Sequence, residues 1–264
     1  MIQFFKDIYR NRELLVRFSW NDFKARFAGS FLGVFWAFVN PLVTIGVYWF
    51  VFGVGLKAGM TNGNIPFVVY LVTGIIAWFF FSDTLMAATN CYREYTYLVK
   101  KVVFDIRILP TSKLMANLYT HVFFIFIAII LSALYGFYPT IKLIQIFYYV
   151  FCLIMFLTGL TWITASIQPF FADLSQIINV FMQILMWGTP ILWSMGIFPA
   201  RFDTMFKLNP LFYIVQGYRD SFLNGPWFWQ YDTMSLYFWV FTLLLLIIGS
   251  KVYNRLSPHF SDVL

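Results

Sequence analysis

The sequence contains little charge. Asp, Glu, Lys and Arg together make up 11% of its 264 residues, whereas a typical soluble domain has about 25%. A water-soluble fold of this length would lack the polar side chains needed to cover its surface, so soluble globular, disordered and fibrous classes are excluded. Hydrophobic residues make up 61% of the chain. This composition predicts an integral membrane protein with several helices.

Residues that usually carry catalysis or bind metals are also scarce. The two cysteines, Cys91 and Cys152, lie far apart in or beside apolar segments, which disfavours a disulfide framework. No Gly-Lys dipeptide occurs, so a phosphate-binding loop is excluded. The two histidines, His121 and His259, belong to no metal-binding motif. We therefore expect no catalytic residue, no metal site and no cofactor in this chain.

Six long apolar stretches dominate the sequence. Each is long enough to cross a hydrocarbon core of about 30 Å, for which a helix needs about 20 residues. The sequence therefore predicts an all-α integral membrane protein in which residues 1–264 form a single transmembrane domain. The predicted spans are 31–55, 67–91, 111–137, 143–167, 174–195 and 234–253.

The distribution of Lys and Arg predicts the orientation. Six spans place both termini on one side of the membrane. Of the 18 basic residues, six lie in 1–30, five in 92–113 and two in the C-terminal tail, which leaves five for the opposite side. Because cytoplasmic loops carry an excess of Lys and Arg, we expect a multi-pass plasma-membrane protein with both termini in the cytoplasm.

Residues 1–30 alternate apolar and basic positions at helical spacing. This pattern predicts an amphipathic helix in the membrane interface, and an ordinary juxtamembrane anchor is the alternative. Arg17, Lys24 and Arg26 belong to its basic set. They either contact lipid headgroups or attract the diphosphate of a substrate at the cytoplasmic entrance.

Two connections are more than linkers. Residues 92–110 are charged and aromatic, and they predict a short helix across the membrane surface. Residues 196–230 lie on the outer side and are rich in proline and aromatics. Within them Asn209-Pro210 is a favourable helix start, because Asn caps the helix and Pro fits its first turn. We expect a re-entrant helical hairpin that dips into the outer leaflet before the last span.

Asp83 is an acid within the second predicted span, where it either faces a pathway or pairs with a cation or hydroxyl inside the bundle. The aromatic content of 23% also allows two interpretations. Most aromatics fit interface belts and lipid-facing positions, whereas a subset is suited to a conduit along which sugar rings slide. Together with Asp83, the candidates for lining such a channel are Tyr48, Trp49, Trp78, Phe79, Phe80, Trp187 and Trp193.

Several motifs resemble those of permease subunits from ABC transporters that export lipid-linked polysaccharides. The motifs are NDFKARF at 21–27, LGVFWAFVNP at 32–41, WFFFS at 78–82 and TPILW at 189–193. VYWFVFG at 47–53 and the run at 207–223 look most similar to the wall teichoic acid translocation permeases of Gram-positive bacteria. Permeases for O-antigen and capsular polysaccharide have the same architecture.

This resemblance implies a homodimer of the chain with two copies of an ATPase subunit, which would bind ATP and Mg. Residues 92–110 would be the coupling helix, residues 1–30 a gate helix at the substrate entrance, and 196–230 an external gate. The implied coupling residues are Arg93, Glu94, Tyr95, Lys100, Lys101, Asp105 and Arg107. The implied external gate residues are Phe212, Tyr213, Tyr218 and Arg219.

The function implied by the resemblance is ATP-driven export of an anionic polymer that is linked to a polyprenyl diphosphate. Wall teichoic acid is the expected polymer. Its partners would be the ATPase, this substrate and membrane lipids, with no nucleic acid. O-antigen or capsular polysaccharide is the alternative substrate. An autonomous channel, a secondary transporter or a membrane-embedded transferase or hydrolase remains open from the residues alone. For a lipid-linked sugar enzyme, only Asp83 is a candidate.

Overall fold

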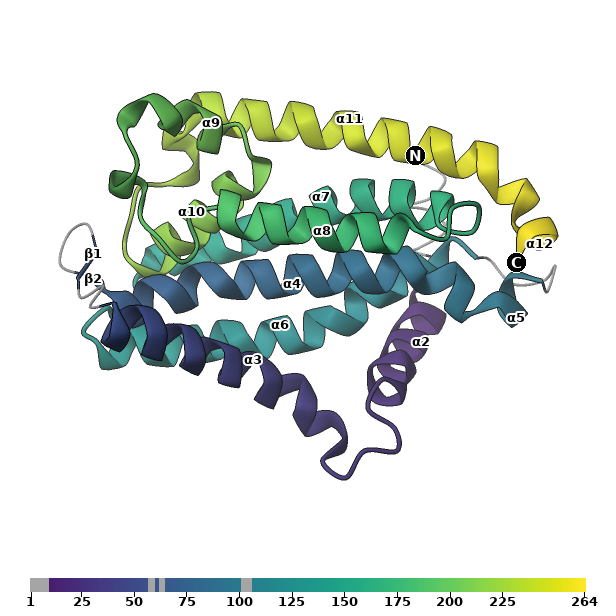
Figure 1. Cartoon of the computed structure of the whole chain (residues 1–264), viewed down its shortest axis with the longest axis horizontal. Coiled ribbons are helices and arrows are strands. Elements are labelled where there is room, and N and C mark those ends of the chain that lie inside the picture. Colours follow the sequence, from purple (N-terminus) through teal and green to yellow (C-terminus); the bar gives the residue numbers. More distant parts are fainter. Residues whose placement is uncertain (1–9, 57–59, 62–64, 101–105) are drawn as a thin grey trace.

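The computed structural model describes residues 10–56, 60–61, 65–100 and 106–264. In this part of the chain the fold is helical apart from one short antiparallel hairpin, in which β1 (Met60–Thr61) pairs with β2 (Ile65–Pro66). Helices α4 (Phe67–Glu94), α6 (Ile108–Leu134), α7 (Gln145–Ile167), α8 (Leu174–Gly188) and α11 (Asp232–Leu256) run alongside one another, and α3 (Trp36–Tyr48) is inclined across them (Figure 1).

Five helical stretches are long and apolar enough to cross a membrane. They are Gly33–Gly55, Phe67–Glu94, Ile108–Leu134, Ile141–Ile167 and Asp232–Val263. The first combines the 3-10 turn η1 (Gly33–Phe35), α3 and the π-helical segment η2 (Trp49–Gly55), the fourth begins with η3 (Ile141–Ile144), and the last ends with η7 (Ser257–His259) and α12 (Phe260–Val263).

The predicted span at 174–195 differs from the other five. Its helix, α8, has 15 residues, or about 22 Å at 1.5 Å per residue, which is shorter than a hydrocarbon core of about 30 Å. The chain leaves the helix at Thr189, whose backbone is extended, and Pro190 follows directly. Five of the predicted spans correspond to the long helical stretches, and the one at 174–195 corresponds to the shorter helix α8, so six full-length spans are not confirmed.

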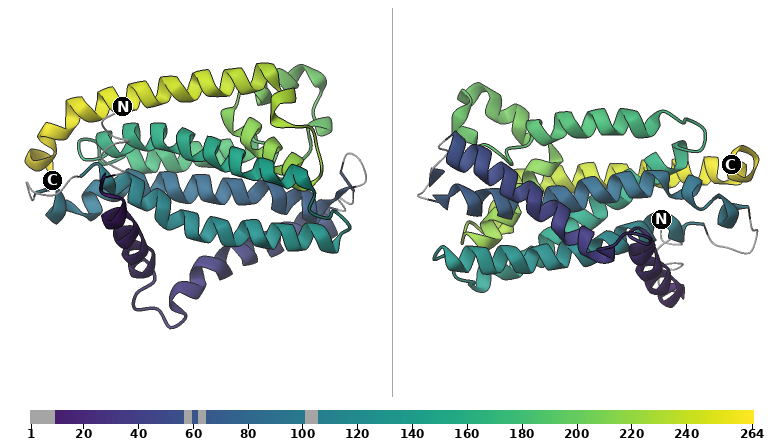
Figure 2. Two further views of the ribbon diagram at one scale, coloured as in Figure 1. Left: turned by 180° about the vertical axis from the view of Figure 1, so that it is seen from behind. Right: turned by 60° about the horizontal axis from the view of Figure 1, so that its bottom comes forward.

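Helix α4 forms the centre of the bundle. It is apolar on nearly every side, a pattern typical of a helix surrounded by protein. In the most apolar stretch of α4, 78% of the residues are buried inside the chain, compared with 11% in that of Gly33–Gly55. It packs against α6, α7, α8 and α10 (Pro210–Phe222), and the views in Figures 1 and 2 place it among these helices.

Glycines allow α7 and α11 to approach closely. An added Cβ on Gly159 would lie 2.9 Å from Cβ of Leu245, and one on Gly249 would lie 2.8 Å from the Gly159 carbonyl oxygen. Small residues commonly permit such backbone contact between membrane helices, where packing replaces the hydrophobic effect as the force that holds helices together. The last long helix is therefore fixed to the bundle through α7.

The N-terminal helix α2 (Arg12–Ala25) covers part of the amphipathic stretch predicted at 1–30. Residues 1–9 of that stretch lie outside the described residues. The buried face of α2 consists of Leu15, Ser19, Asp22 and Phe23, and the helix packs on α6. It lies towards the end of the bundle where α5 (Thr96–Val99) and α12 are also found (Figure 1).

The connection between α8 and α11 lies at the opposite end of the bundle. It contains η4 (Met195–Ile197), η5 (Ala200–Phe202), α9 (Asp203–Lys207), α10 and η6 (Phe228–Gln230). Helix α10 begins at the Asn209-Pro210 pair as predicted, with the Asn209 side chain accepting a hydrogen bond from the Leu211 amide at 3.0 Å. Gly217 allows α10 to reach α7, because a Cβ there would lie 2.0 Å from the Tyr149 ring.

Candidate functional site

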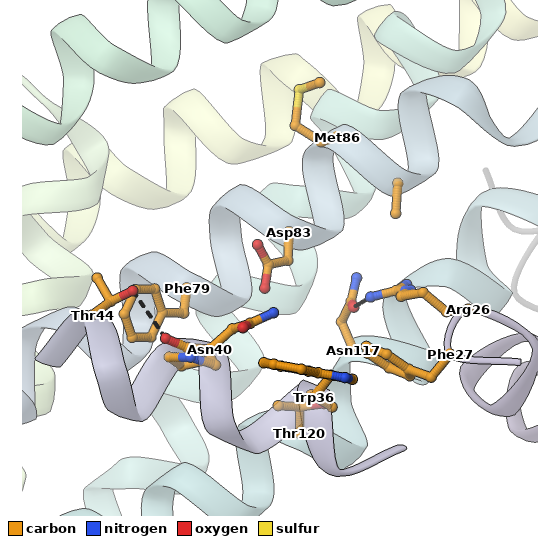
Figure 3. A pocket seen from close by; sticks show the side chains of 13 residues that line it. Arg26, Phe27, Trp36, Asn40, Thr44, Phe79, Asp83, Met86, Asn117 and Thr120 are labelled. Carbon is orange, nitrogen blue, oxygen red and sulfur yellow. Dashed lines mark hydrogen bonds between the residues drawn. The ribbon is translucent and has the colours of Figure 1, made fainter. Parts of the chain in front are cut away.

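A polar cavity of about 480 Å³ lies between α2, α3, α4 and α6 (Figure 3). Trp36 and Phe79 contribute ring surface to its wall. Its polar lining is unusual for a site among apolar spans, where polar side chains commonly mark a pathway or binding site. The polar lining residues are Arg26, Asn40, Thr44, Asp83, Asn117 and Thr120.

Asp83 projects from α4 into this cavity, toward Asn40 on α3 (Figure 3). It lies eleven residues before the end of α4, or about 16 Å along a helix about 42 Å long. The side chain is exposed in the isolated chain. Among the described residues no cation lies within ion-pair distance of its carboxylate. Asp83 therefore faces the cavity, where Arg26 lies on the same wall.

Arg26 and Asn117 form another part of the cavity wall. The Arg26 guanidinium donates a hydrogen bond of 2.7 Å to Oδ1 of Asn117. Asn117 is 4% exposed, and its Nδ2 is buried without a hydrogen-bond partner among the described residues. A buried amide donor of this kind costs free energy unless it finds an acceptor. The wall thus presents both a carboxylate acceptor and an unused amide donor.

The other two basic residues predicted at the substrate entrance lie elsewhere on α2. Arg17 and Lys24 are exposed and are not among the lining residues of the cavity. The Lys24 ammonium lies 5.5 Å from the centre of the Trp20 ring. Of the three, the structure brings only Arg26 next to the polar cavity.

An ionic cluster around the buried pair of Lys113 and Asp22 ties α2 to the bundle next to the predicted coupling loop. Lys113 on α6 lies 2.6 Å from Asp22 on α2 and 2.5 Å from Glu94 at the end of α4. Tyr95 donates a hydrogen bond to the same Asp22 carboxylate. Burial, followed by this hydrogen bond, raises the pKa of Tyr95 above its usual value, so the phenol remains a donor at physiological pH.

The predicted coupling residues occupy different environments. Glu94 and Tyr95 belong to the ionic cluster, while Arg93 and Lys100 are exposed near α5. The Arg107 guanidinium lies 5.7 Å from the ring centre of Tyr253 on α11. Lys101 and Asp105 lie outside the described residues.

All four predicted external gate residues are buried on α10. Phe212, Tyr213, Tyr218 and Arg219 are between 0% and 4% exposed. Tyr218 shares a hydrogen bond of 2.8 Å with His121 on α6. The Arg219 guanidinium donates to the carbonyl oxygens of Tyr70 at 3.3 Å and Ile191 at 3.0 Å, and it lies 3.6 Å from the Tyr70 ring centre. Helix α10 is thereby fastened to α4 and to the segment after α8.

The aromatic channel candidates lie in different environments. Trp78 and Phe80 are buried. Phe80 stacks on His121 and also lines a small cavity of about 20 Å³ beside Asp83. Phe79 lines the polar cavity beside Asp83, while Tyr48 packs against the core. Trp49 and Trp187 are exposed. Trp193 donates its ring N–H to the Trp187 carbonyl at 3.1 Å.

Four residues of these sites were not predicted individually from the sequence: Trp36, Asn117, Asp22 and Lys113. A signal was available for two of them. Lys113 and Asn117 are polar residues at the beginning of an otherwise apolar stretch, and such residues usually face protein or water rather than lipid. For Asp22 no local signal existed, because its partners Tyr95 and Lys113 lie just after α4 and on α6.

The chain is similar to several transport proteins along most of its length. The O-antigen export system permease protein RfbA of Klebsiella pneumoniae is 26% identical over 253 residues, covering 96% of this chain and 95% of that protein. RfbA of Myxococcus xanthus is 29% identical over 225 residues, covering 84% and 85%. The polysialic acid transport protein KpsM of Escherichia coli is 22% identical over 239 residues, covering 88% and 89%.

A family model described as "ABC-2 type transporter" matches residues 13–223, most of the chain. The match extends from α2 to the end of α10, so it includes the polar cavity and the ionic cluster. With its long apolar helices, the chain is a multi-pass membrane protein. It belongs to the ABC-2 type transporter family.

Proposed function

We propose that this chain is the transmembrane subunit of an ATP-driven exporter of a lipid-linked polysaccharide, working as a homodimer with two copies of a separate ATPase. The observation that carries the proposal is the polar cavity between α2, α3, α4 and α6. It is combined with relatives, along most of the chain, that are named as an O-antigen export system permease protein and a polysialic acid transport protein. ATP and Mg would bind to the ATPase, and this chain would make or break no covalent bond.

The substrate we favour is a polysaccharide of the O-antigen or capsule kind. The relatives are named for O-antigen and polysialic acid. The comparisons therefore do not support the closer likeness to wall teichoic acid permeases expected from residues 47–53 and 207–223, nor the expected Gram-positive origin. The exporter class is retained, and its substrate is revised.

The exposed carboxylate favours a dimer. Asp83 lies well inside α4 and is exposed in the isolated chain, and a charged group at that depth is costly in contact with hydrocarbon. A second copy of the chain beside α3 and α8 would shield this region and provide the opposite wall of a path. The apolar exposed faces of these two helices suit such a contact, with Val43, Val47, Phe181 and Ile184 among their exposed residues.

We further propose six membrane crossings with both termini in the cytoplasm. Helix α8 is short, but it runs along the bundle beside α4 (Figure 1), and residues 189–193 lengthen its path. Buried Arg219 satisfies the Ile191 carbonyl where this extension is no longer helical, as backbone at membrane depth requires. Helices α2, α5 and α12 share one end of the bundle, in agreement with the Lys/Arg distribution.

The ionic cluster suggests how ATP binding reaches the substrate path. Movement of the segment after α4 would act first on Glu94 and Tyr95. Through Lys113 on α6 and its partner Asp22, the movement would then reach α2. Helix α2 in turn leads to Arg26 at the cavity wall. A nucleotide-dependent shift between two arrangements of these helices would open and close the cavity.

Purification in mild detergent, followed by mass spectrometry and ATPase assays, tests this function. We expect a stoichiometric ATPase subunit whose hydrolysis rate rises when lipid-linked O-antigen is added. The double variant Lys100→Glu/Lys101→Glu should lose export while the folded permease stays in the membrane, because Lys100 is exposed beside α5. A chain that reproducibly purifies alone, or undiminished export by the variant, would contradict the proposal.

A further inference from the structure

We infer that the polar cavity between α2, α3, α4 and α6 is a binding site for a sugar ring of the substrate, and that it selects hydroxyl groups rather than phosphate. The inference rests on the proposed function for the source of the sugar, but its chemistry comes from the cavity itself. The residues that carry it are Trp36, Asp83 and Asn117.

The hydrogen-bonding demands of the wall define the ligand. The Asp83 carboxylate only accepts hydrogen bonds, and no described cation pairs with it. The buried Nδ2 of Asn117 only donates, and it has no partner among the described residues. A ligand that satisfies both must offer donors and acceptors together. A hydroxyl group does both, and a sugar ring carries several hydroxyls.

Phosphate meets only half of these demands. Its oxygens accept from Asn117 and from Arg26, but an ionised phosphate has no proton to donate to Asp83. The like charges of a phosphate and the carboxylate also repel each other, and Arg26 on the same wall offsets only part of this repulsion because its guanidinium already donates to Asn117. The cavity as a whole therefore disfavours the diphosphate group and favours the uncharged ring of a sugar.

The shape and lining of the cavity agree with this ligand. A volume of about 480 Å³ lies within the range of small-molecule sites, about 300 to 1,000 Å³. Trp36 lies across the cavity from Asp83 (Figure 3), and its indole offers an apolar face on which the C–H face of a sugar packs. Asn40 and Thr120 add further groups that both donate and accept.

Protection of an introduced cysteine tests the site directly. Cys91 and Cys152 are both 0% exposed, so the native chain should give little background with a maleimide. Thr44→Cys places a thiol on the cavity wall, and Thr204→Cys places one on an exposed part of α9 as a control. The permease in lipid nanodiscs would be labelled with the maleimide in the presence of one competitor at a time. The competitors are n-octyl β-D-glucoside, n-octyl phosphate and an octyl tetraoxyethylene ether.

We expect the glucoside to slow labelling of Thr44→Cys more than the other two probes, with no effect on Thr204→Cys. Asp83→Leu should weaken this protection about tenfold or more, since a hydrogen bond to a charged group is lost. Asp83→Asn, which keeps hydrogen-bonding capacity, should weaken it less. Asp262→Leu, on the exposed C-terminal helix α12, is the matched control and should leave protection unchanged.

Two outcomes would overturn the inference. Equal protection by the ether would mean a pocket for alkyl chains only. Stronger protection by octyl phosphate, unchanged or improved by Asp83→Leu, would mean an anion site. Because Asp83 is exposed in the isolated chain, Leu should be tolerated by the fold, and an unchanged gel-filtration profile would verify this. The assay requires neither ATPase nor transport, so a failed proposal of exporter function would leave its result interpretable.

Discussion

The ammonium of Lys113 lies 2.6 Å from the carboxylate of Asp22, and both side chains are 4% exposed. The pair joins helix α6 to helix α2 across 91 positions of sequence. This buried charged contact holds helix α2 against the bundle, and Glu94 extends it toward the segment that we propose faces the ATPase.

Removal of Lys113 should be strongly destabilising. Lys113→Met leaves the Asp22 carboxylate buried without its cation, and breaking one side of a buried pair costs about 3–5 kcal/mol. Thermal unfolding in detergent, followed by fluorescence-detected gel filtration, would measure the loss. Lys251→Met removes an exposed Lys on α11 and is the control. The double variant Asp22→Asn/Lys113→Met should recover part of the stability. Equal unfolding temperatures for the Lys113 and Lys251 variants would refute the role of the pair.

Gly217→Ala should disrupt the packing of α10 on α7. A Cβ there would lie 2.0 Å from Cε1 of Tyr149, and overpacking of a core typically costs about 1–3 kcal/mol. Gly46→Ala is the matched control, since nothing lies within 4 Å of a Cβ at that helical position. Tyr149→Leu added to Gly217→Ala should restore the yield of folded protein. A Gly217→Ala protein as stable as the Gly46→Ala protein would contradict this account.

Arg219 should be needed for its geometry as well as its charge. Arg219→Met removes the donors to the Tyr70 and Ile191 carbonyls, and each unsatisfied buried group costs about 1–3 kcal/mol. Arg219→Lys keeps a charge but offers no planar fork, so it should be intermediate. The readouts are thermal unfolding and export. Arg201→Met, at an exposed Arg of the same external segment, should behave like the native chain. A fully stable Arg219→Met protein would rule out the anchoring role.

The proposed orientation predicts a labelling pattern. Thr204 on α9 and Ser261 on α12 are both exposed, and they lie near opposite ends of α11 (Figure 1). A single cysteine would be introduced at each position. In right-side-out vesicles an impermeant maleimide should label Thr204→Cys, and Ser261→Cys should react only after the membrane is opened. The native chain is the control, because its two cysteines are buried. The reverse pattern would place the C terminus outside.

Much of the architecture could be predicted because it depends on local pattern. Long apolar runs identify membrane helices whatever they pack against, and the Asn209-Pro210 pair marks the start of α10 through its own capping bond. The length of α8 was harder to predict. Residues 174–195 are apolar throughout, and where that helix ends depends on Thr189-Pro190 and on the Arg219 contact with Ile191, which comes from a distant part of the chain.

That the protein is a helical membrane protein follows from the amino-acid sequence alone, because too few charged residues are present to cover a soluble fold and because apolar runs of sufficient length are a local property. The sequence also marks Asp83 as an unusual charge. What Asp83 faces, which aromatics are core, and the meeting of Asp22, Glu94 and Lys113 became clear from the folded chain. These facts depend on how helices distant in sequence are rotated and packed against one another, and no single segment encodes them.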